Sequence, residues 1–476
     1  MADGRTVNVN RKSGYDLAVI GAGSAGFSAS IAAAEQGANV ALIGHGSIGG
    51  TCVNIGCVPS KTMIRAAEAL HGARMASRFP GLAGEAHITD WRSLIAAKDN
   101  LVSGLRQKKY VDLLPEYDGI AYLEGPARLN GTGVQVNGDA IQVDKIIITT
   151  GARPALPDIA GIETVSCLTS TTALELTSLP KSLLVIGAGY IGCELAQMFA
   201  RMGVQVTIVS RRGLLPEAEP EIAGALTGFF TDEGIRVISG IAYRRIEQIG
   251  GDAVLTIERD GQDEGLTAER VLIATGRTPN TEGLGLNEVG VAQHSNRAIR
   301  VDERMRSTRP GIYAAGDVTG RDQFVYMAAY GAKLAARNAL NGDGLVYDNA
   351  AMPAVVFTDP QVASVGLTEM QARQARHKVK TSVLSLDNLP RALAARDTRG
   401  LIKLVADTQT DRLLGAHILA PEGADSIQTA ALAIRYGMTV QELAATIFPY
   451  LTTVEGLKLT AQAFEKDVAK LSCCAG

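Results

Sequence analysis

The chain has 476 residues, of which 46% are hydrophobic and 20% are charged. This globular composition excludes disordered, collagen-like and disulfide-scaffold proteins, and the length predicts about three domains. The formal net charge is −3 and only 5% of residues are aromatic, so neither nucleic acid nor an anionic membrane is an expected partner. No apolar run reaches the roughly 20 residues of a membrane span, and residues 1–14 lack the apolar core of a secretory signal. We therefore expect a cytoplasmic protein.

A strand, a glycine turn, a helix and a second strand are predicted between residues 15 and 43. In a dinucleotide fold, the first glycine of such a turn permits a sharp bend and the second lets the backbone approach a pyrophosphate. The third lets the helix pack on the strand. The N–H groups at the start of the helix then attract phosphate. The predicted cofactor contacts in this loop are Gly21, Gly23, Ser24, Ala25 and Gly26.

A segment with two cysteines follows the second strand of this unit. Cys52 and Cys57 lie on a helix-like stretch and can form a disulfide if the local turn brings them together. We expect them beside the first cofactor, where a dithiol can exchange two electrons with a flavin. Gly50 and Thr51 are predicted to contact the same cofactor. The alternatives are two buried thiols or half of a zinc site, but no CxxC or HxxxH partner pair accompanies them.

The same strand, glycine turn, helix and strand recur at residues 182–209. Two such loops in one chain are a stronger signal than one. A NAD site usually ends the second strand with Asp or Glu, whereas here Arg211 and Arg212 follow it, and their guanidinium groups suit the 2′-phosphate of NADPH. The alternative interpretation is a solvated basic loop. The predicted cofactor contacts in the second loop are Gly187, Gly189, Tyr190 and Gly192.

Three further turns follow predicted strands and add candidate cofactor contacts. An Asp at a strand end can accept a hydrogen bond from a ribose or ribityl hydroxyl. These candidates are Thr150, Gly151, Gly276 and Asp317. From Met352 the pattern changes, and no further glycine loop occurs. Strands are predicted at 353–357, 379–385, 400–406 and 412–418, and helices at 426–436 and 440–445. We expect this third region to serve assembly and to complete a site.

Along nearly its whole length the sequence resembles the pyridine nucleotide–disulfide oxidoreductases. The resemblance is carried by the Cys52–Cys57 motif, both glycine loops, Thr275-Gly276-Arg277, Gly316-Asp317 and residues 353–366. It implies an α/β fold with two Rossmann-like dinucleotide-binding domains, a C-terminal α+β dimerisation domain, FAD at the first loop, NADPH at the second, and a homodimer. The implied boundaries are 1–165 with 282–350 for FAD, 166–281 for NADPH, and 352–476 for the interface domain.

The resemblance also implies roles for individual residues. Cys57 would face the flavin as the charge-transfer thiol, and Cys52 would be the exchanging thiol. Lys61 and Glu194 resemble the ion pair at the reactive edge of the flavin, and Asp317 would bond its ribityl chain. The sequence departs from the family at Gly44, where many members carry a Glu for the adenosine ribose.

The substrate side differs from that of the disulfide-reducing members. Those members carry a His-Pro pair near the C-terminus, and the His protonates the leaving thiolate of the substrate. Here Phe448 occupies the position of the His, and Thr453 occupies the position of its Glu partner. The sequence has no His after His417. We therefore expect poor reduction of disulfide substrates.

The C-terminal tail carries the adjacent thiols of Cys473 and Cys474, which suit a soft metal ion. Together with the Cys52–Cys57 pair and the missing His, this tail resembles that of the mercury(II)-reducing members of the family. The hypothesis is an NADPH-dependent flavoenzyme that reduces thiol-bound Hg(II) to Hg(0). In it, Cys473 and Cys474 of the partner subunit capture Hg(II) and transfer it by ligand exchange to Cys52 and Cys57.

Two tyrosines are assigned to this reaction. Tyr190 lies in the second glycine loop and is predicted to gate the nicotinamide pocket. Tyr450 is predicted to line the metal path, with a simple packing role as the alternative.

Two other functions remain open at this point. One is a thioredoxin reductase-like enzyme with Cys473 and Cys474 as an electron relay, against which Phe448 argues. The other is a non-catalytic protein that holds a soft metal on four thiols, against which both cofactor motifs argue.

Overall fold

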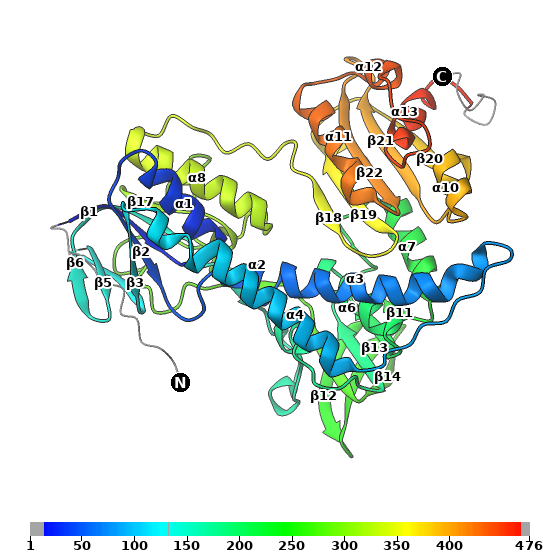
Figure 1. The fold of residues 1–476 in the computed structure, drawn as a ribbon, viewed down its shortest axis with the longest axis horizontal. Coiled ribbons are helices and arrows are strands. Elements are labelled where there is room, and N and C mark those ends of the chain that lie inside the picture. The colour runs from blue at the N-terminus through cyan, green and yellow to red at the C-terminus, as the bar shows by residue number, and fades with distance from the viewer. Residues whose placement is uncertain (1–13, 132, 468–476) are drawn as a thin grey trace. The chain divides into compact units, whose positions relative to one another are not determined.

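The computed structural model describes residues 14–131 and 133–467, which divide into two compact units (Figure 1). Unit 1 comprises the described chain up to Ser60, together with the described residues of Ser93–Ala155 and Arg277–Asp348. Unit 2 comprises Lys61–Arg92, Leu156–Gly276 and the described chain from Asn349 onward. The predicted tail thiols, Cys473 and Cys474, lie outside the described residues.

Unit 1 is built on a five-stranded parallel sheet in the order β17-β7-β1-β2-β3. The strands are β1 (Tyr15–Ile20), β2 (Val40–Gly44), β3 (Ile120–Glu124), β7 (Val143–Ile148) and β17 (Ile312–Ala314). The central strands are continuous apolar runs because both faces of a parallel sheet are covered. Helices α1 (Ser24–Ala34) and α8 (Val325–Asn341) lie side by side (Figure 1), with alanines in their shared core. This arrangement confirms the strand, turn, helix and strand predicted at the N-terminus.

The rest of unit 1 consists of small antiparallel pieces and connecting turns. One three-stranded sheet has β5 at its centre, and one two-stranded sheet pairs β8 with β16. The strands are β4 (Ala127–Asn130), β5 (Gly133–Val136), β6 (Asp139–Ile141), β8 (Ala152–Pro154) and β16 (Arg277–Pro279). The short helices and turns are α2 (Gly50–Asn54), η2 (Gln107–Val111), η3 (Leu114–Glu116) and η5 (Asp317–Thr319). The boundary between the units falls within α3 (Cys57–Arg74) and α4 (Trp91–Arg106).

The first part of unit 2 repeats the parallel plan with a sheet in the order β11-β10-β9-β15. Its strands are β9 (Ser182–Ile186), β10 (Gln205–Ser210), β11 (Arg236–Ser239) and β15 (Arg270–Ile273). Helices α6 (Tyr190–Arg201) and α7 (Pro220–Asp232) follow β9 and β10. An antiparallel sheet of β12 (Ala242–Ile249), β13 (Asp252–Arg259) and β14 (Gln262–Ala268) packs against it. Alternate residues of β13 are buried, as expected for a strand with one face on the core.

The C-terminal part of unit 2 is an antiparallel sheet in the order β18-β19-β22-β21-β20. Its strands are β18 (Ala354–Val356), β19 (Gln361–Gly366), β20 (Val379–Ser385), β21 (Leu401–Asp407) and β22 (Leu413–Ala420). Its helices are α9 (Glu369–Gln374), α10 (Pro390–Ala395), α11 (Gly423–Arg435), α12 (Val440–Ala445) and α13 (Glu455–Gln462). The predicted mixture of α/β halves and an α+β C-terminal region is confirmed. The sequence patterns had not predicted β19, α9, α10 or α13.

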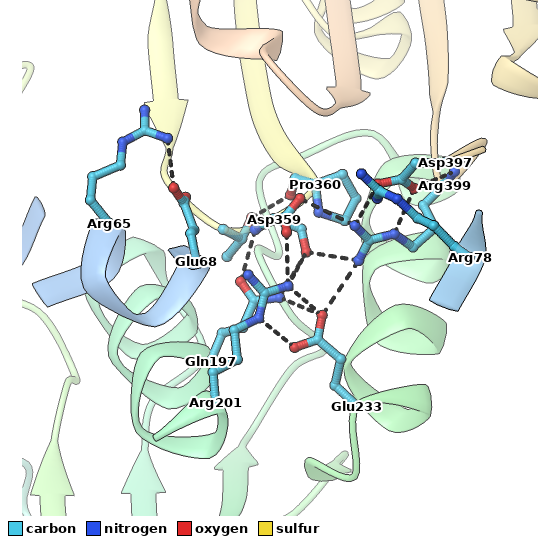
Figure 2. A network of polar contacts seen from close by, with 11 residues as sticks. Arg65, Glu68, Arg78, Gln197, Arg201, Glu233, Asp359, Pro360, Asp397 and Arg399 are labelled. Atoms are coloured by element: carbon cyan, nitrogen blue, oxygen red, sulfur yellow. Dashed lines mark hydrogen bonds and ion pairs between the residues drawn. The ribbon is translucent and has the colours of Figure 1, made fainter. Parts of the chain in front are cut away.

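A network of charges joins α6, α7 and the C-terminal sheet within unit 2 (Figure 2). The side chain of Arg201 is 3% exposed and lies 2.6 Å from Glu233 Oε1 and 2.9 Å from Asp359 Oδ2. Arg399 lies 3.3 Å from Asp359 Oδ1 and 2.8 Å from Asp397 Oδ2. Removing one member of such a network leaves an uncompensated buried charge, which is strongly destabilising. The network therefore fixes the position of α6, whose other end carries the second glycine loop.

In the part of the chain that the structure describes, no helix has both the length and the apolarity needed to cross a membrane.

Candidate functional site

The two cysteines of unit 1 lie on successive helices, the first short and the second long. Cys52 is on α2, and Cys57 begins α3 after a break at Ile55 and Gly56. The helix-like stretch expected there consists of two helices separated by a tight turn, where a Cβ at Gly56 would lie 2.9 Å from the Thr51 carbonyl oxygen. Both cysteines are half-buried.

The dithiol segment lies directly on the first glycine loop. Gly49 N donates to the Ala22 carbonyl at 2.8 Å, and Gly49 pairs with Gly23 as a β-bridge. A Cβ at Gly50 would lie 2.7 Å from Gly23 Cα, and Gly50 has a φ of 67°, so glycine is required there on both counts. The segment that carries the two cysteines therefore lies against the first glycine loop.

The first loop joins the end of β1 closely to the start of α1. Gly23, the N-cap of α1, has no side-chain hydrogen bond to the helix N-terminus, so the N–H groups of the first turn are available to a ligand. A Cβ at Gly26 would lie 1.8 Å from the Gly21 carbonyl oxygen, so the helix starts in close contact with the strand end. Ser24 Oγ lies 3.0 Å from Tyr110 Oη, and Ala25 is buried.

The structure gives a reason for Gly44. A Cβ at this position would lie 2.6 Å from Tyr122 Oη and 2.7 Å from Ala22 Cβ. No larger side chain fits without moving Tyr122, so the Glu of many family members has no room here.

The predicted strand-end contacts of unit 1 form a second edge of this site. Thr150 Oγ1 donates to the Asn280 carbonyl at 2.7 Å, and Asn280 N donates to the Gly151 carbonyl at 2.9 Å. Asp317 follows β17 and lies 3.4 Å from Arg277 Nε. Burial raises the pKa of Asp317, while Arg277 opposes that rise. These groups offer hydroxyl, carbonyl and carboxyl partners for a polar ligand.

Unit 2 contains the predicted ion pair. Lys61 Nζ lies 2.6 Å from Glu194 Oε2, and the Glu194 side chain is only 6% exposed. Glu194 Oε1 also accepts from the backbone N of Phe357 at 2.9 Å. Lys61 Nζ lies 4.9 Å from the centre of the Phe357 ring, within the range of a cation–π contact. Phe357 is therefore a partner that the sequence analysis missed, although it lies inside the quoted stretch 353–366.

The second glycine loop is more open than the first. A Cβ at Gly189 would meet no atom of the described chain within 4 Å, whereas one at Gly192 would lie 2.2 Å from the Gly187 carbonyl oxygen. Tyr190 begins α6 and is 39% exposed. Gly276 follows β15 with a φ of 114°. The loop therefore combines tight packing behind it with space in front.

The two arginines after β10 differ in their surroundings. The Arg211 guanidinium lies 5.4 Å from the centre of the Tyr243 ring, and Tyr243 Oη donates to the Val209 carbonyl at 3.2 Å. Arg212 lies 2.9 Å from Glu217 Oε1, and both of these side chains are well exposed. Tyr243 was not found from the sequence because it comes from β12, a strand distant in the chain.

The C-terminal region contains the predicted substrate-side residues of unit 2. Phe448 packs against the core of the antiparallel sheet, and Tyr450 is 47% exposed. Thr453 Oγ1 donates to Glu422 Oε2 at 3.3 Å. Glu455 is buried, accepts from Leu451 N at 3.2 Å, and has a pKa raised by its burial. The hydroxyl of Thr453 thus contacts a carboxylate, where disulfide-reducing members would have a Glu.

Comparisons with known proteins agree with these features. The family model described as pyridine nucleotide-disulphide oxidoreductase matches residues 15–336. The model for the dimerisation domain of that family matches residues 352–461.

Several curated relatives are similar over nearly the whole chain. A mercuric reductase of Staphylococcus aureus is 46% identical over 473 residues, which cover 99% of this chain and 86% of the relative. A mercuric reductase of Streptomyces lividans is 47% identical over 472 residues, which cover 97% of this chain and 99% of the relative. Among solved structures, the Cu(II) complex of the HOCl-induced flavoprotein disulfide reductase RclA from Escherichia coli is 31% identical with a TM-score of 0.84. That match covers 96% of this chain and 100% of the RclA chain.

Proposed function

Because the chain belongs to the pyridine nucleotide-disulphide oxidoreductase family, we propose that it is an NADPH-dependent flavoenzyme that reduces Hg(II) to Hg(0). In the overall reaction, NADPH loses a hydride, Hg(II) gains two electrons, and one proton is released. The observation that carries the proposal is the dithiol segment seated on the first glycine loop through Gly49 and Gly50. The relatives named mercuric reductase support the choice of metal.

FAD is the group that we assign to the first loop. Its contacts are Gly21, Gly23, Ser24, Ala25, Gly26, Gly50, Thr51, Thr150, Gly151 and Asp317. When bound, FAD supplies the two-electron chemistry that links a hydride donor to a dithiol. The residues fit this group, because the N-terminus of α1 lacks a side-chain cap and polar groups occupy the neighbouring strand ends.

NADPH is assigned to the second loop at Gly187, Gly189 and Gly192, with Gly276 nearby. Arg211 and Arg212 hold the 2′-phosphate, and Tyr190 gates the nicotinamide pocket. The open space at Gly189 and the exposure of Tyr190 support a ligand that enters and leaves during each turnover.

The dithiol and the ion pair carry the remaining roles. Cys57 is the thiol nearer the flavin and Cys52 the exchanging thiol, and both bind Hg(II) as thiolates. Lys61 is held by Glu194 and Phe357, so its ammonium is fixed rather than free to rotate. We assign this fixed charge to the reactive edge of the flavin site.

We assign delivery of the metal to Cys473 and Cys474 of the partner subunit in a homodimer. Soft thiolates exchange Hg(II) readily because each step replaces one sulfur ligand by another. Tyr450 lines the path of the metal. The match of residues 352–461 to a dimerisation domain supports the dimer. The proposed location remains cytoplasmic, where thiols stay reduced.

The deciding experiment measures NADPH oxidation by the full-length protein with excess small thiol at neutral pH. Hg(II) is compared with thioredoxin, glutathione disulfide and lipoamide, while released Hg(0) is trapped and quantified. We expect consumption with Hg(II) alone, with one Hg(0) released per NADPH. Turnover with a disulfide and none with Hg(II) would instead favour the relay enzyme. A protein that binds Hg(II) without bound flavin or NADPH oxidation would favour the metal-holding alternative.

The role of the tail is tested by the double variant Cys473→Ala/Cys474→Ala. We expect turnover with thiol-complexed Hg(II) to fall, while the reduction of Cys52 and Cys57 by NADPH is retained. Unchanged turnover would exclude the delivery role.

A further inference from the structure

We propose that Arg106 is a positioning residue which, through Asn54, holds the segment between Cys52 and Cys57 and thereby favours their disulfide. The inference rests on the proposed function only in taking Cys52 and Cys57 as the redox pair. It adds a residue from outside the dithiol segment to the reaction.

Asn54 lies between the two cysteines and closes the turn that carries them. Its Nδ2 donates to the Ile48 carbonyl and to the Gly50 carbonyl, each at 2.9 Å. One side-chain amide therefore ties the end of α2 back to the residues that precede and begin it. Since α2 has only five residues, these bonds replace much of the order that a longer helix would supply.

Arg106 fixes the other end of the same amide. Its Nη1 donates to Asn54 Oδ1 at 3.2 Å. Once this oxygen is held, the amide cannot flip, and both Nδ2 hydrogens remain directed at their carbonyls. Arg106 is half-buried, so its stem is restricted and the bond is better ordered than one at the open surface.

The helix that carries Arg106 is itself shaped for this contact. The last residue of α4 leads into η2, a π-helical turn, and such wide turns are found frequently at functional sites. The turn presents Tyr110 to the same region. The Tyr110 ring packs edge-on against Phe27 with centres 4.9 Å apart, and it would contact a Cβ at Gly49 at 3.2 Å. The end of α4 thus contacts the dithiol segment at Asn54, and the π turn places Tyr110 where only glycine fits at position 49.

A fixed segment changes the chemistry of the pair because a disulfide forms in proportion to the effective concentration of one thiol at the other. Oxidation of Cys52 and Cys57 by oxidised dithiothreitol forms one S–S bond and passes two electrons and two protons to the reagent. If the hydrogen bond from Arg106 to Asn54 is removed, the two thiols sample more positions, and the equilibrium constant for this oxidation should fall. A purely electrostatic role for Arg106 predicts the opposite sign, because a nearby cation stabilises the thiolates of the reduced state.

The experiment equilibrates full-length protein with dithiothreitol buffers of graded ratio and quantifies oxidised and reduced Cys52–Cys57 peptides by thiol labelling and mass spectrometry. We expect Arg106→Ala to lower the equilibrium constant about tenfold, which corresponds to about 30 mV. Arg106→Lys, which can still donate to Asn54, should recover most of it. Lys109→Ala removes a positive charge from the same π turn and should leave the constant unchanged.

A double-variant cycle then tests the route of the effect. Arg106→Ala should have little further effect in an Asn54→Ala background, because Arg106 acts through Asn54. Three results would overturn the positioning role of Arg106. The first is an equilibrium constant for Arg106→Ala within twofold of the parent value, and the second is a rise in that constant. The third is an additive effect of the two substitutions in the cycle. If Asn54→Ala does not fold, the three single variants at Arg106 and Lys109 decide the question. The measurement uses no mercury, so failure of the proposed reaction and failure of the positioning role are separate results.

Discussion

The two glycine loops share a motif and a backbone plan, yet their surroundings differ. The first loop is covered by its own chain, because the dithiol segment pairs with Gly23 and places Gly50 against it. In the second loop, a Cβ at the equivalent Gly189 would meet nothing within 4 Å in the described chain. A covered loop suits a ligand that stays bound, and an open loop suits one that exchanges. Under the proposed function, the same motif serves a bound FAD and an exchanging NADPH, and the segment that packs against each loop distinguishes the two sites.

The regions behind the two loops are also stabilised differently. The helix of the first loop, α1, packs through alanines against α8. The helix of the second loop, α6, is tied by ions at both ends, through Glu194 to Lys61 and through Arg201 to Glu233 and Asp359. The stability of the second region should therefore fall more when a charged side chain is removed. The stability of the first region should fall more when the size of a packed side chain is changed.

The largest expected effect is a loss of stability when the buried ion pairs of Lys403 in unit 2 are broken. Lys403 is 2% exposed and lies 2.9 Å from Glu219, 2.8 Å from Glu221 and 3.0 Å from Glu369. Burial alone would lower the pKa of Lys403, but hydrogen bonds to the three carboxylates raise it. Lys403→Met should lower the free energy of unfolding by about 3–5 kcal/mol in urea titrations, because the buried carboxylate of Glu219 loses the ammonium group that balances its charge.

The matched control is Lys380→Met, which removes a lysine paired with Asp411 where each side chain is 28% exposed. This change should cost less than about 1 kcal/mol. Equal losses in the two variants would contradict the view that the second region depends on buried charge.

Substitution of the third glycine of each loop, Gly26 or Gly192, should destabilise the protein to a similar extent. Gly26→Ala places a Cβ 1.8 Å from a carbonyl oxygen, and Gly192→Ala places one 2.2 Å from a carbonyl oxygen. Each should lower the free energy of unfolding by about 1–3 kcal/mol.

Gly189→Ala should leave the melting temperature unchanged but raise the KM for NADPH, since its methyl group enters the ligand space. A lower melting temperature in Gly189→Ala would break the comparison.

Arg211 and Arg212, which follow β10, should contribute unequally to the preference for NADPH over NADH. Arg211 is ordered by Tyr243, whereas Arg212 already contacts Glu217. Arg211→Gln should raise the KM for NADPH about 10- to 100-fold, as expected for loss of a hydrogen bond to a charged group. Arg212→Gln should raise it only a few-fold. The KM for NADH is the control, and an equal rise for NADH would place Arg211 away from the 2′-phosphate.

The smallest effect concerns a surface pair of the first region. Glu282 lies 2.6 Å from both Arg153 and Arg297, and the hydrogen bond from Arg153 lowers the pKa of Glu282 to about 2. A depressed carboxyl pKa contributes stability above the unfolded pKa of about 4.3. This contribution is lost as the pH falls toward 2. Glu282→Gln should cost less than about 1 kcal/mol at pH 7 because the pair is exposed. The difference from the parent in urea titrations should shrink between pH 5 and pH 3, and a difference that grows with acid would contradict the assignment.

The local patterns of the sequence determined much of this protein. Apolar runs and glycine turns predicted β1, β9 and both helix starts, because these features depend on neighbours in the chain. The spacing of β20 and α12 was likewise readable. The pairing of Lys61 with Glu194 followed only from the family resemblance, since the two residues are far apart in sequence.

Only the tertiary structure decided what surrounds these motifs. Tyr110, Tyr243 and Phe357 reach the candidate sites from distant segments, and no local pattern encodes such contacts. The replacement of a Glu by Gly44 became explicable once Tyr122 was seen to fill the space. The difference between a covered and an open glycine loop is of the same kind. The sequence specifies the backbone of each loop through short-range sterics, whereas long-range packing determines what lies in front of it.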